Sequence, residues 1–149
     1  MRFEQELRVG VDCPEPEDMV TVAAKLAPLL PKNITLLLDG EMGAGKTYFV
    51  SSLAKAFGVA EPVTSPTYDL VATYRAPNRN LIHIDAFRIE TGKEMETLGV
   101  EELLVSPWLL LVEWPAKAPE LHFGETWRLL IETPARGGRR LQLRRGLVG

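Results

Sequence analysis

The chain has 149 residues, of which 46% are hydrophobic and 25% are charged, so its composition is that of a folded domain rather than a disordered segment. Its single cysteine, Cys13, excludes an intramolecular disulfide and a zinc site built from cysteines. The net charge of -3 does not favour general nucleic-acid binding, and no stretch reaches the ~20 apolar residues that cross a bilayer. We therefore expect a single cytoplasmic domain over residues 1–149.

The first part of the chain predicts a strand, a helix, a buried strand and a second helix. Residues 2–9 alternate as a half-buried strand does, and apolar residues at helical spacing follow Pro16 as far as Pro31. Residues 34–39 form a short apolar run, which is typical of a central strand buried on both faces. A glycine-rich turn then leads into the second helix, which Gly58 is suited to end.

The rest of the chain predicts mainly strands. Their segments are residues 67–74, 81–85, 109–113, 127–132 and 139–144. The first two are expected to pair as a hairpin, because the linker between them is rich in turn-forming residues. Short helices are expected within residues 94–105. Strands and helices alternate in the middle, with antiparallel strands at both ends, so the pattern predicts an α/β fold with a mixed, mainly parallel sheet and helices on both faces.

One motif matches the phosphate-binding pattern G-x-x-x-x-G-K-[ST] in full, between a predicted buried strand and a predicted helix. Its residues are Gly40, Glu41, Met42, Gly43, Ala44, Gly45, Lys46 and Thr47. The glycines permit backbone angles that turn several amide groups toward one phosphate. We expect Lys46 to reach the β- and γ-phosphates and the Thr47 hydroxyl to ligate Mg²⁺. The motif therefore predicts binding of ATP and Mg²⁺ by a P-loop NTPase-like fold.

Two predicted strands end in a carboxylate, at Glu113 and at Asp85. Both would lie at the carboxyl edge of the sheet, where ligands bind in open α/β folds. We expect Glu113 to join the Mg²⁺ shell and Asp85 to bind the metal's waters or the attacking water, although the sequence does not order these two roles. The alternative for each is a cap on the following helix. His83 shares a strand side with Asp85, either as a packed core histidine or as a catalytic one.

The polar segment 64–67 follows the predicted P-loop helix, where nucleotide switches often lie. Thr64, Ser65 and Thr67 are candidates for sensing the γ-phosphate. A Ser-Pro turn with a capping role is an equally good interpretation of this segment.

The end of the chain is strongly basic, because five arginines and no acidic residue follow Glu132. We call these residues the Arg-rich tail: Arg136, Arg139, Arg140, Arg144 and Arg145. The tail is either a strand at the sheet edge that its charges protect from pairing, or a surface for a phosphate-rich partner such as tRNA. The alternation of leucines with polar residues slightly favours the strand.

Several of these segments together resemble the TsaE family, also called YjeE, the P-loop ATPase component of bacterial tRNA threonylcarbamoyladenosine synthesis. They are residues 40–47, 63–68, 83–88, 98–99 and 112–115. The resemblance implies ATP and Mg²⁺ as ligands and a weak ATPase activity. It also implies that the TsaD and TsaB proteins are partners, and that they, not this chain, transfer the threonylcarbamoyl group to adenosine in tRNAs that read codons beginning with A.

By the same resemblance, Thr47 and Glu113 are metal ligands, Asp85 is needed for hydrolysis, and residues 64–67 are a switch segment. Contact with tRNA would be indirect or through the Arg-rich tail. The chain departs from the family pattern at Tyr48, Asp69, Phe87 and Ala116. No residue of an adenine pocket can be assigned from the sequence.

Two other functions compete with this interpretation. A small P-loop kinase would use the same phosphate loop, but it also needs a lid and an acceptor site, and residues 60–80 and 89–107 are short for such a domain. An interaction module that binds nucleotide without turnover is disfavoured by the presence of both Asp85 and Glu113.

Overall fold

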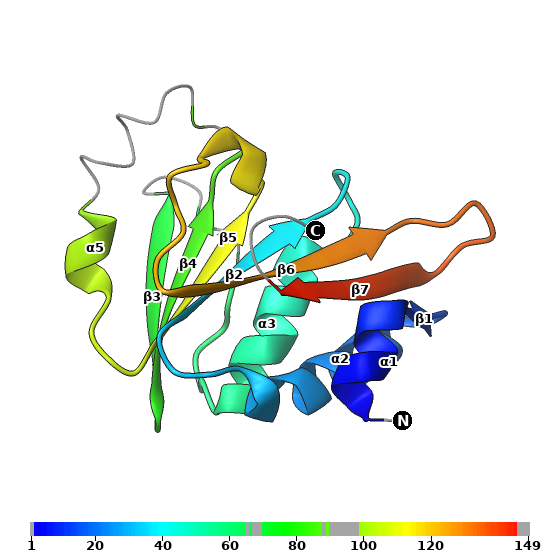
Figure 1. Cartoon of the computed structure of the whole chain (residues 1–149), viewed down its shortest axis with the longest axis horizontal. Helices are drawn as coiled ribbons and strands as arrows, with labels where there is room; N and C mark the ends of the chain where they lie inside the picture. Colours follow the sequence, from blue (N-terminus) through cyan, green and yellow to red (C-terminus); the bar gives the residue numbers. More distant parts are fainter. Residues whose placement is uncertain (1, 65, 67–69, 88, 90–98, 146–149) are drawn as a thin grey trace.

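The computed structural model describes residues 2–64, 66, 70–87, 89 and 99–145. Its strands are β1 (Val11–Cys13), β2 (Ile34–Asp39), β3 (Val71–Ala76), β4 (Arg79–Asp85), β5 (Trp108–Glu113), β6 (Glu125–Glu132) and β7 (Arg139–Arg145). They form one sheet in the order β1-β7-β6-β2-β5-β4-β3 (Figure 1). The four central strands, β6, β2, β5 and β4, are parallel, whereas β7, β1 and β3 pair antiparallel to their neighbours. The predicted mixed α/β sheet is confirmed.

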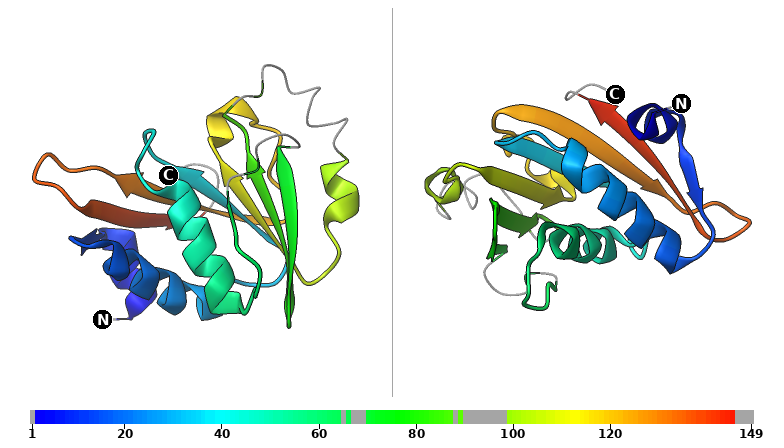
Figure 2. Two further views of the ribbon diagram at one scale, coloured as in Figure 1. Left: turned by 180° about the vertical axis from the view of Figure 1, so that it is seen from behind. Right: turned by 90° about the horizontal axis from the view of Figure 1, so that it is seen from below.

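Helices cover the two faces of the sheet unequally. They are α1 (Phe3–Val9), α2 (Pro16–Leu26), η1 (Ala27–Leu29), α3 (Lys46–Phe57), α5 (Val100–Leu103) and η2 (Pro115–Lys117). The first four lie on one face, and the short α5 and η2 lie on the other (Figures 1 and 2). Among the described residues, no helix combines the length and the apolar character needed to cross a membrane.

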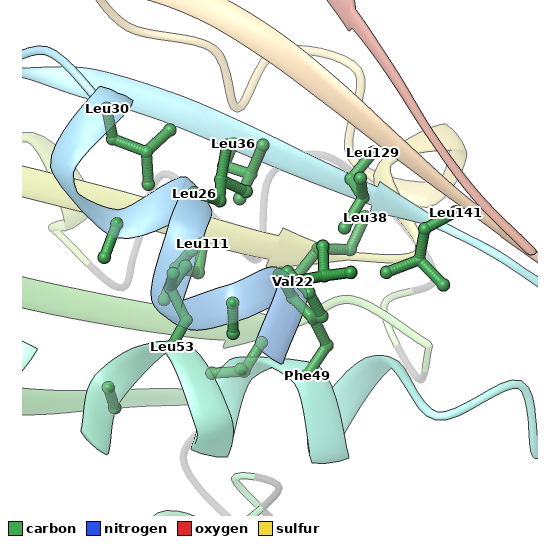
Figure 3. Packing of buried hydrophobic residues seen from close by; sticks show 14 of the residues in the cluster. Val22, Leu26, Leu30, Leu36, Leu38, Phe49, Leu53, Leu111, Leu129 and Leu141 are labelled. Carbon is green, nitrogen blue, oxygen red and sulfur yellow. The ribbon is translucent and has the colours of Figure 1, made fainter. Parts of the chain in front are cut away.

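The larger core lies between the sheet and helices α2 and α3. Figure 3 shows Val22 and Leu26 of α2 and Phe49 and Leu53 of α3 gathered around the sheet, where Leu36 of β2 meets them. Each of these side chains is at most 3% exposed, and burial of such a side chain contributes about 1.5–3 kcal/mol. A second core, which includes Val100 of α5, lies on the opposite face of the sheet, and the neighbouring residue Leu37 packs into it. Strand β2 is therefore buried on both faces, as its apolar run predicts.

The strand expected over residues 2–9 is wrong, because this segment forms helix α1. The apolar residues Phe3 and Leu7 are four positions apart, and a spacing of four fits both the period of a strand and that of a helix. The third apolar residue, Val9, would have decided in favour of a strand, yet it is 65% exposed. Glu4 and Glu6 in the first turn and Arg8 in the last complement the helix dipole.

The other predicted elements correspond to observed ones with shifted ends. Strands β3 and β4 form the expected hairpin, but its turn is shorter than the predicted linker and consists of Pro77 and Asn78. Residues 67–69 of the predicted strand and 94–98 of the predicted helical region lie outside the described residues. The tail strand β7 is not at the sheet edge, because it pairs with β6 on one side and with β1 on the other.

Candidate nucleotide-binding site

The P-loop occupies the turn between β2, which ends at Asp39, and α3, which begins at Lys46. Gly45 caps the helix with φ of 104°, a left-handed conformation that side chains rarely adopt. Gly40 is required for a different reason: a Cβ at this position would lie 2.8 Å from the backbone oxygen of Ile131 on β6. The loop is therefore packed closely against β6 at its start and turned by a glycine at its end.

Lys46 lies folded back over this loop and is only 5% exposed. Its Nζ donates hydrogen bonds to the backbone oxygens of Gly40, at 2.5 Å, and Glu41, at 3.0 Å. The same ammonium lies 3.9 Å from the ring centroid of Trp114, a cation–π contact. Burial lowers the pKa of Lys46, an effect that the negative charges of Glu113 and other nearby carboxylates oppose.

Glu113, at the end of β5, is the centre of a buried hydrogen-bond network. The Thr47 hydroxyl donates to both of its carboxylate oxygens, at 2.8 and 3.0 Å, and Nε2 of His83 lies 2.6 Å from Oε2. His83 is fully buried and Glu113 is 3% exposed. Among the described residues, His83 Nδ1 has no hydrogen-bond partner, so the proton of a neutral ring belongs on Nε2, where it is donated to the carboxylate. Glu113 therefore does not act as the helix cap that was its alternative role.

Asp85 lies beside Glu113, because the two residues are directly paired in the parallel register of β4 and β5. Its Oδ1 accepts a hydrogen bond from the backbone N–H of Phe87 at 3.0 Å, which closes a turn immediately after β4. The structure thus brings together the two carboxylates that the sequence places at strand ends.

These side chains face one cavity of about 330 Å³ at the carboxyl ends of β2, β4 and β5. It is lined by Met42, Gly43, Gly45, Lys46, Thr47, Tyr48, Asp85, Phe87, Glu113 and Trp114. Of the predicted site residues, Gly40, Glu41, Ala44 and Thr64 are not part of this lining. Ser65 and Thr67 lie outside the described residues, so the switch segment stays a prediction.

The sequence analysis did not identify the aromatic wall of this cavity. Phe87 and Trp114 contact each other with ring centroids 5.0 Å apart. Their positions carried a usable signal, because Trp114 directly follows Glu113 and Phe87 follows Asp85 by two residues. Trp114 adopts a left-handed backbone with φ of 59°, which turns the chain sharply at the end of β5.

A second cavity, of about 360 Å³, adjoins the first, and Gly45 and Tyr48 line both. Its other lining residues are Cys13, Pro14, Glu15, Pro16, Met19, Ala44, Gly138 and Arg139. Cys13 is buried here, and burial together with Asp18 and Asp12 raises the pKa of its thiol to about 11. This cavity, too, was missed from the sequence, because it is assembled from three distant segments.

The arginines of the tail are largely engaged within the protein. Arg136 and Arg140 both pair with Asp12, and Arg145 contacts Glu4 and Glu125. Much of the positive charge that suggested a nucleic-acid surface is therefore neutralised by carboxylates on α1, β1 and β6.

Comparison with known proteins identifies the family to which the chain belongs. Residues 13–141 match the family model described as "Threonylcarbamoyl adenosine biosynthesis protein TsaE". The chain belongs to the TsaE family. This family is involved in the biosynthesis of threonylcarbamoyladenosine in tRNA.

Curated TsaE proteins support the assignment. The TsaE protein of Aquifex aeolicus is 42% identical over 94 residues, which are 62% of this chain and 70% of that protein. The TsaE protein of Rickettsia conorii is 39% identical over 99 residues, which are 66% of this chain and 56% of that protein. The matched part of the chain thus spans little more than half of the Rickettsia conorii protein's length.

A solved TsaE-like fold agrees with the observed architecture. The crystal structure of Bacillus subtilis YdiB superposes with a TM-score of 0.72 at 25% sequence identity. The superposition covers 92% of this chain and 85% of that chain. The expected P-loop NTPase-like fold is therefore confirmed.

Proposed function

We propose that this TsaE-family protein binds ATP together with Mg²⁺, hydrolyses it slowly and thereby supports threonylcarbamoyladenosine formation in tRNA. The observation that carries the proposal is the convergence of Lys46, Thr47, Asp85 and Glu113 on one cavity. An ammonium, a hydroxyl and two carboxylates at the carboxyl edge of a parallel sheet are the groups that a triphosphate and its metal require.

The phosphates would bind where the P-loop meets the first turn of α3. The backbone N–H groups of that turn have no partners within the helix, and the helix dipole favours an anion there. Lys46 would exchange its two backbone carbonyl partners for phosphate oxygens, and Trp114 would keep covering its side chain. A cavity of about 330 Å³ falls within the usual size range of small-molecule sites.

The oxygen donors fit a magnesium ion. Thr47 and Glu113 would hold Mg²⁺, which prefers oxygen ligands and keeps several waters. In the described part of the chain no three His, Cys, Asp or Glu residues gather as a metal site, so phosphate oxygens and water would complete the coordination. His83 would keep Glu113 oriented through its hydrogen bond. When bound, the metal would neutralise charge on the phosphates.

Hydrolysis would depend on Asp85, which lies beside Glu113 in the cavity lining and would orient a water molecule next to the metal shell. Catalysis of phosphoryl transfer rests mainly on positioning and charge stabilisation. An arginine that contacts the transferred phosphate contributes on the order of 10³ to 10⁵-fold in rate. No arginine is present among the described residues that line the cavity, which supports a slow turnover.

The second cavity would hold the nucleoside part of ATP. It continues from the phosphate cavity past Gly45 and Tyr48. Its walls include the apolar side chains of Pro14, Pro16 and Met19, which suit the face of a planar base.

Family membership favours the role in tRNA modification over the kinase considered from the sequence. By the resemblance described above, the partners would be TsaD and TsaB, and they would carry out the transfer to tRNA. Contact of the chain with tRNA would be mainly indirect, since most tail arginines already have carboxylate or backbone partners.

The proposal is tested by calorimetry with MgATP, followed by reconstitution with TsaD, TsaB, tRNA and a supplied activated threonylcarbamoyl donor. We expect saturable binding of MgATP and, in the reconstitution, several modified tRNAs per TsaD–TsaB complex only when this chain and ATP are present. Lack of any nucleotide binding, or an equal yield of threonylcarbamoyladenosine without the chain, would contradict the proposal. A phosphorylated acceptor in place of plain ATP hydrolysis would instead support a kinase.

A further inference from the structure

The first residue of β7, Arg139, reaches across the molecule to the P-loop. Its Nε donates to the backbone oxygen of Ala44 at 2.7 Å, and its Nη2 donates to that of Gly43 at 2.9 Å. Its Nη1 donates to the backbone oxygen of Gly138 at 2.7 Å, within its own hairpin. One partly buried guanidinium thus connects the C-terminal hairpin to two consecutive peptide groups of the phosphate loop.

The loop is held unevenly around this point, because Ala44 is fully buried in the larger core whereas Gly43 is not packed. Gly43 has a positive φ of 81°, and a Cβ built on it would meet no atom within 4 Å, so packing does not fix its backbone. The N–H of Ala44 is used within the loop, where it donates to the backbone oxygen of Glu41 at 3.0 Å. The carbonyl of the next peptide group, between Ala44 and Gly45, is held from outside the loop by Arg139.

The direction of these hydrogen bonds matters for anion binding. In a trans peptide the C=O and the following N–H point in opposite directions. Since Arg139 holds the carbonyl of Ala44, the N–H of Gly45 is directed away from the guanidinium and remains available to a ligand. A positive charge at the carbonyl end also polarises the peptide group, which strengthens its N–H as a donor.

The hairpin that presents Arg139 is itself held in place. A Cβ on Gly138 would lie 2.9 Å from the backbone oxygen of Cys13, so the hairpin is packed directly against β1. The other strand of the hairpin, β6, contacts the P-loop directly, because Gly40 lies against the backbone of Ile131. The hairpin therefore provides a fixed support from which a side chain can restrain the loop.

We propose that Arg139 is a positioning residue that holds the P-loop backbone, and with it the Gly45 N–H, in place for phosphate before the nucleotide binds. It contacts the loop backbone rather than the reacting atoms, so its effect is on affinity and not on the chemical step. Holding the loop in its bound conformation removes an ordering cost from binding. This inference rests on the proposed binding of MgATP.

The test compares Arg139→Met and Arg139→Lys with the matched variant Arg140→Met. Arg140 lies on the same strand and bonds Asp12 and the backbone oxygen of Val9, and neither partner belongs to the P-loop. Binding of MgATP and of magnesium tripolyphosphate, which lacks a base, is measured by displacement of a fluorescent ATP analogue. Hydrogen exchange of peptides covering residues 40–47 is measured in the same samples.

We expect Arg139→Met to weaken MgATP and tripolyphosphate by the same factor, at least about tenfold, since two charge-assisted hydrogen bonds are lost. The amides of residues 40–47 should exchange faster, while turnover at saturating MgATP should stay within about threefold of wild type. Arg139→Lys should recover only part of the affinity, because an ammonium lacks the planar fork that holds two carbonyls. Arg140→Met should bind both ligands within about twofold of wild type.

Three results would overturn the inference. The inference would be wrong if folded Arg139→Met or Arg139→Lys showed wild-type ligand affinity and wild-type hydrogen exchange of residues 40–47. It would also be wrong if Arg140→Met lost as much ligand affinity as Arg139→Met. Weakened MgATP with unchanged tripolyphosphate would make Arg139 a contact of the nucleoside instead. If wild-type protein bound neither ligand, the proposed function itself would fail. If wild type bound both ligands and the Arg139 variants bound them equally well, the inference alone would fail. If Arg139→Met did not fold, Arg139→Lys would carry the test.

Discussion

The P-loop and the Arg-rich tail are both charged motifs, but their contacts lie at different distances along the chain. Lys46 bonds backbone oxygens five and six residues away. Arg139 bonds the same loop from 95 and 96 residues away, and Arg140 reaches Asp12 across 128 residues. A motif whose partners lie inside it reveals its chemistry through spacing alone. A charge with distant partners reveals only that it must be solvated or paired.

The strongest test of the local motif is Lys46→Ala. We expect the affinity for MgATP to fall by at least about a hundredfold and hydrolysis to be lost, because in the proposed function this ammonium binds the β- and γ-phosphates. Calorimetry measures the affinity. The matched control is Lys55→Ala on the exposed side of the same helix, which should bind normally. Normal binding by Lys46→Ala would mean that the spacing of the motif is misleading.

This contrast explains what sequence reasoning could and could not provide. The central strands and the helices α2 and α3 follow from apolar runs and helical spacing, which are local properties. Lys46 and Thr47 follow from the motif, and the two carboxylates from their places at strand ends. The residues of α1 were misassigned because two apolar residues at a spacing of four satisfy both helical and strand periods.

The remaining site features depend on tertiary contacts. That His83 bonds Glu113 requires β4 to lie beside β5 in one particular register. The second cavity requires the N-terminus of α2, the P-loop and the β6–β7 hairpin to meet. Parallel neighbours and hairpin packing are set by the whole fold, so no short window of sequence specifies them.

The next test concerns Glu113, whose contacts with Thr47 and His83 lie 66 and 30 residues away along the chain. Glu113→Gln keeps the shape of the side chain but removes the charge that Thr47 and His83 now contact. We expect hydrolysis to fall by about a hundredfold and the Mg²⁺ concentration for half-maximal ATP binding to rise by about tenfold. Glu132→Gln, at the exposed end of β6, is the control and should change neither value. An unchanged magnesium requirement would refute the assignment of Glu113 as a metal ligand.

A smaller effect on binding is expected for Asp85→Asn. Turnover should drop by about ten- to a hundredfold, because the side chain would no longer orient the attacking water as a carboxylate. The affinity for MgATP should stay within about threefold, since in the proposed function Asp85 acts beside the metal shell rather than on the phosphates. Single-turnover hydrolysis and calorimetry on the same preparation separate the two quantities. Equal losses in both would show that Asp85 binds the nucleotide complex instead.

The smallest effect is expected at the exposed end of the tail. Arg145 contacts Glu125 at 3.2 Å and Glu4 at 3.6 Å, and its side chain is 45% exposed. Exposed ion pairs contribute only ~0.2–1 kcal/mol, so Arg145→Gln should lower the free energy of unfolding in urea by no more than that. The loss should shrink in high salt, and MgATP affinity should not change, because Arg145 does not line either cavity. A loss of nucleotide affinity in Arg145→Gln would mean that the whole tail, and not Arg139 alone, acts on the P-loop.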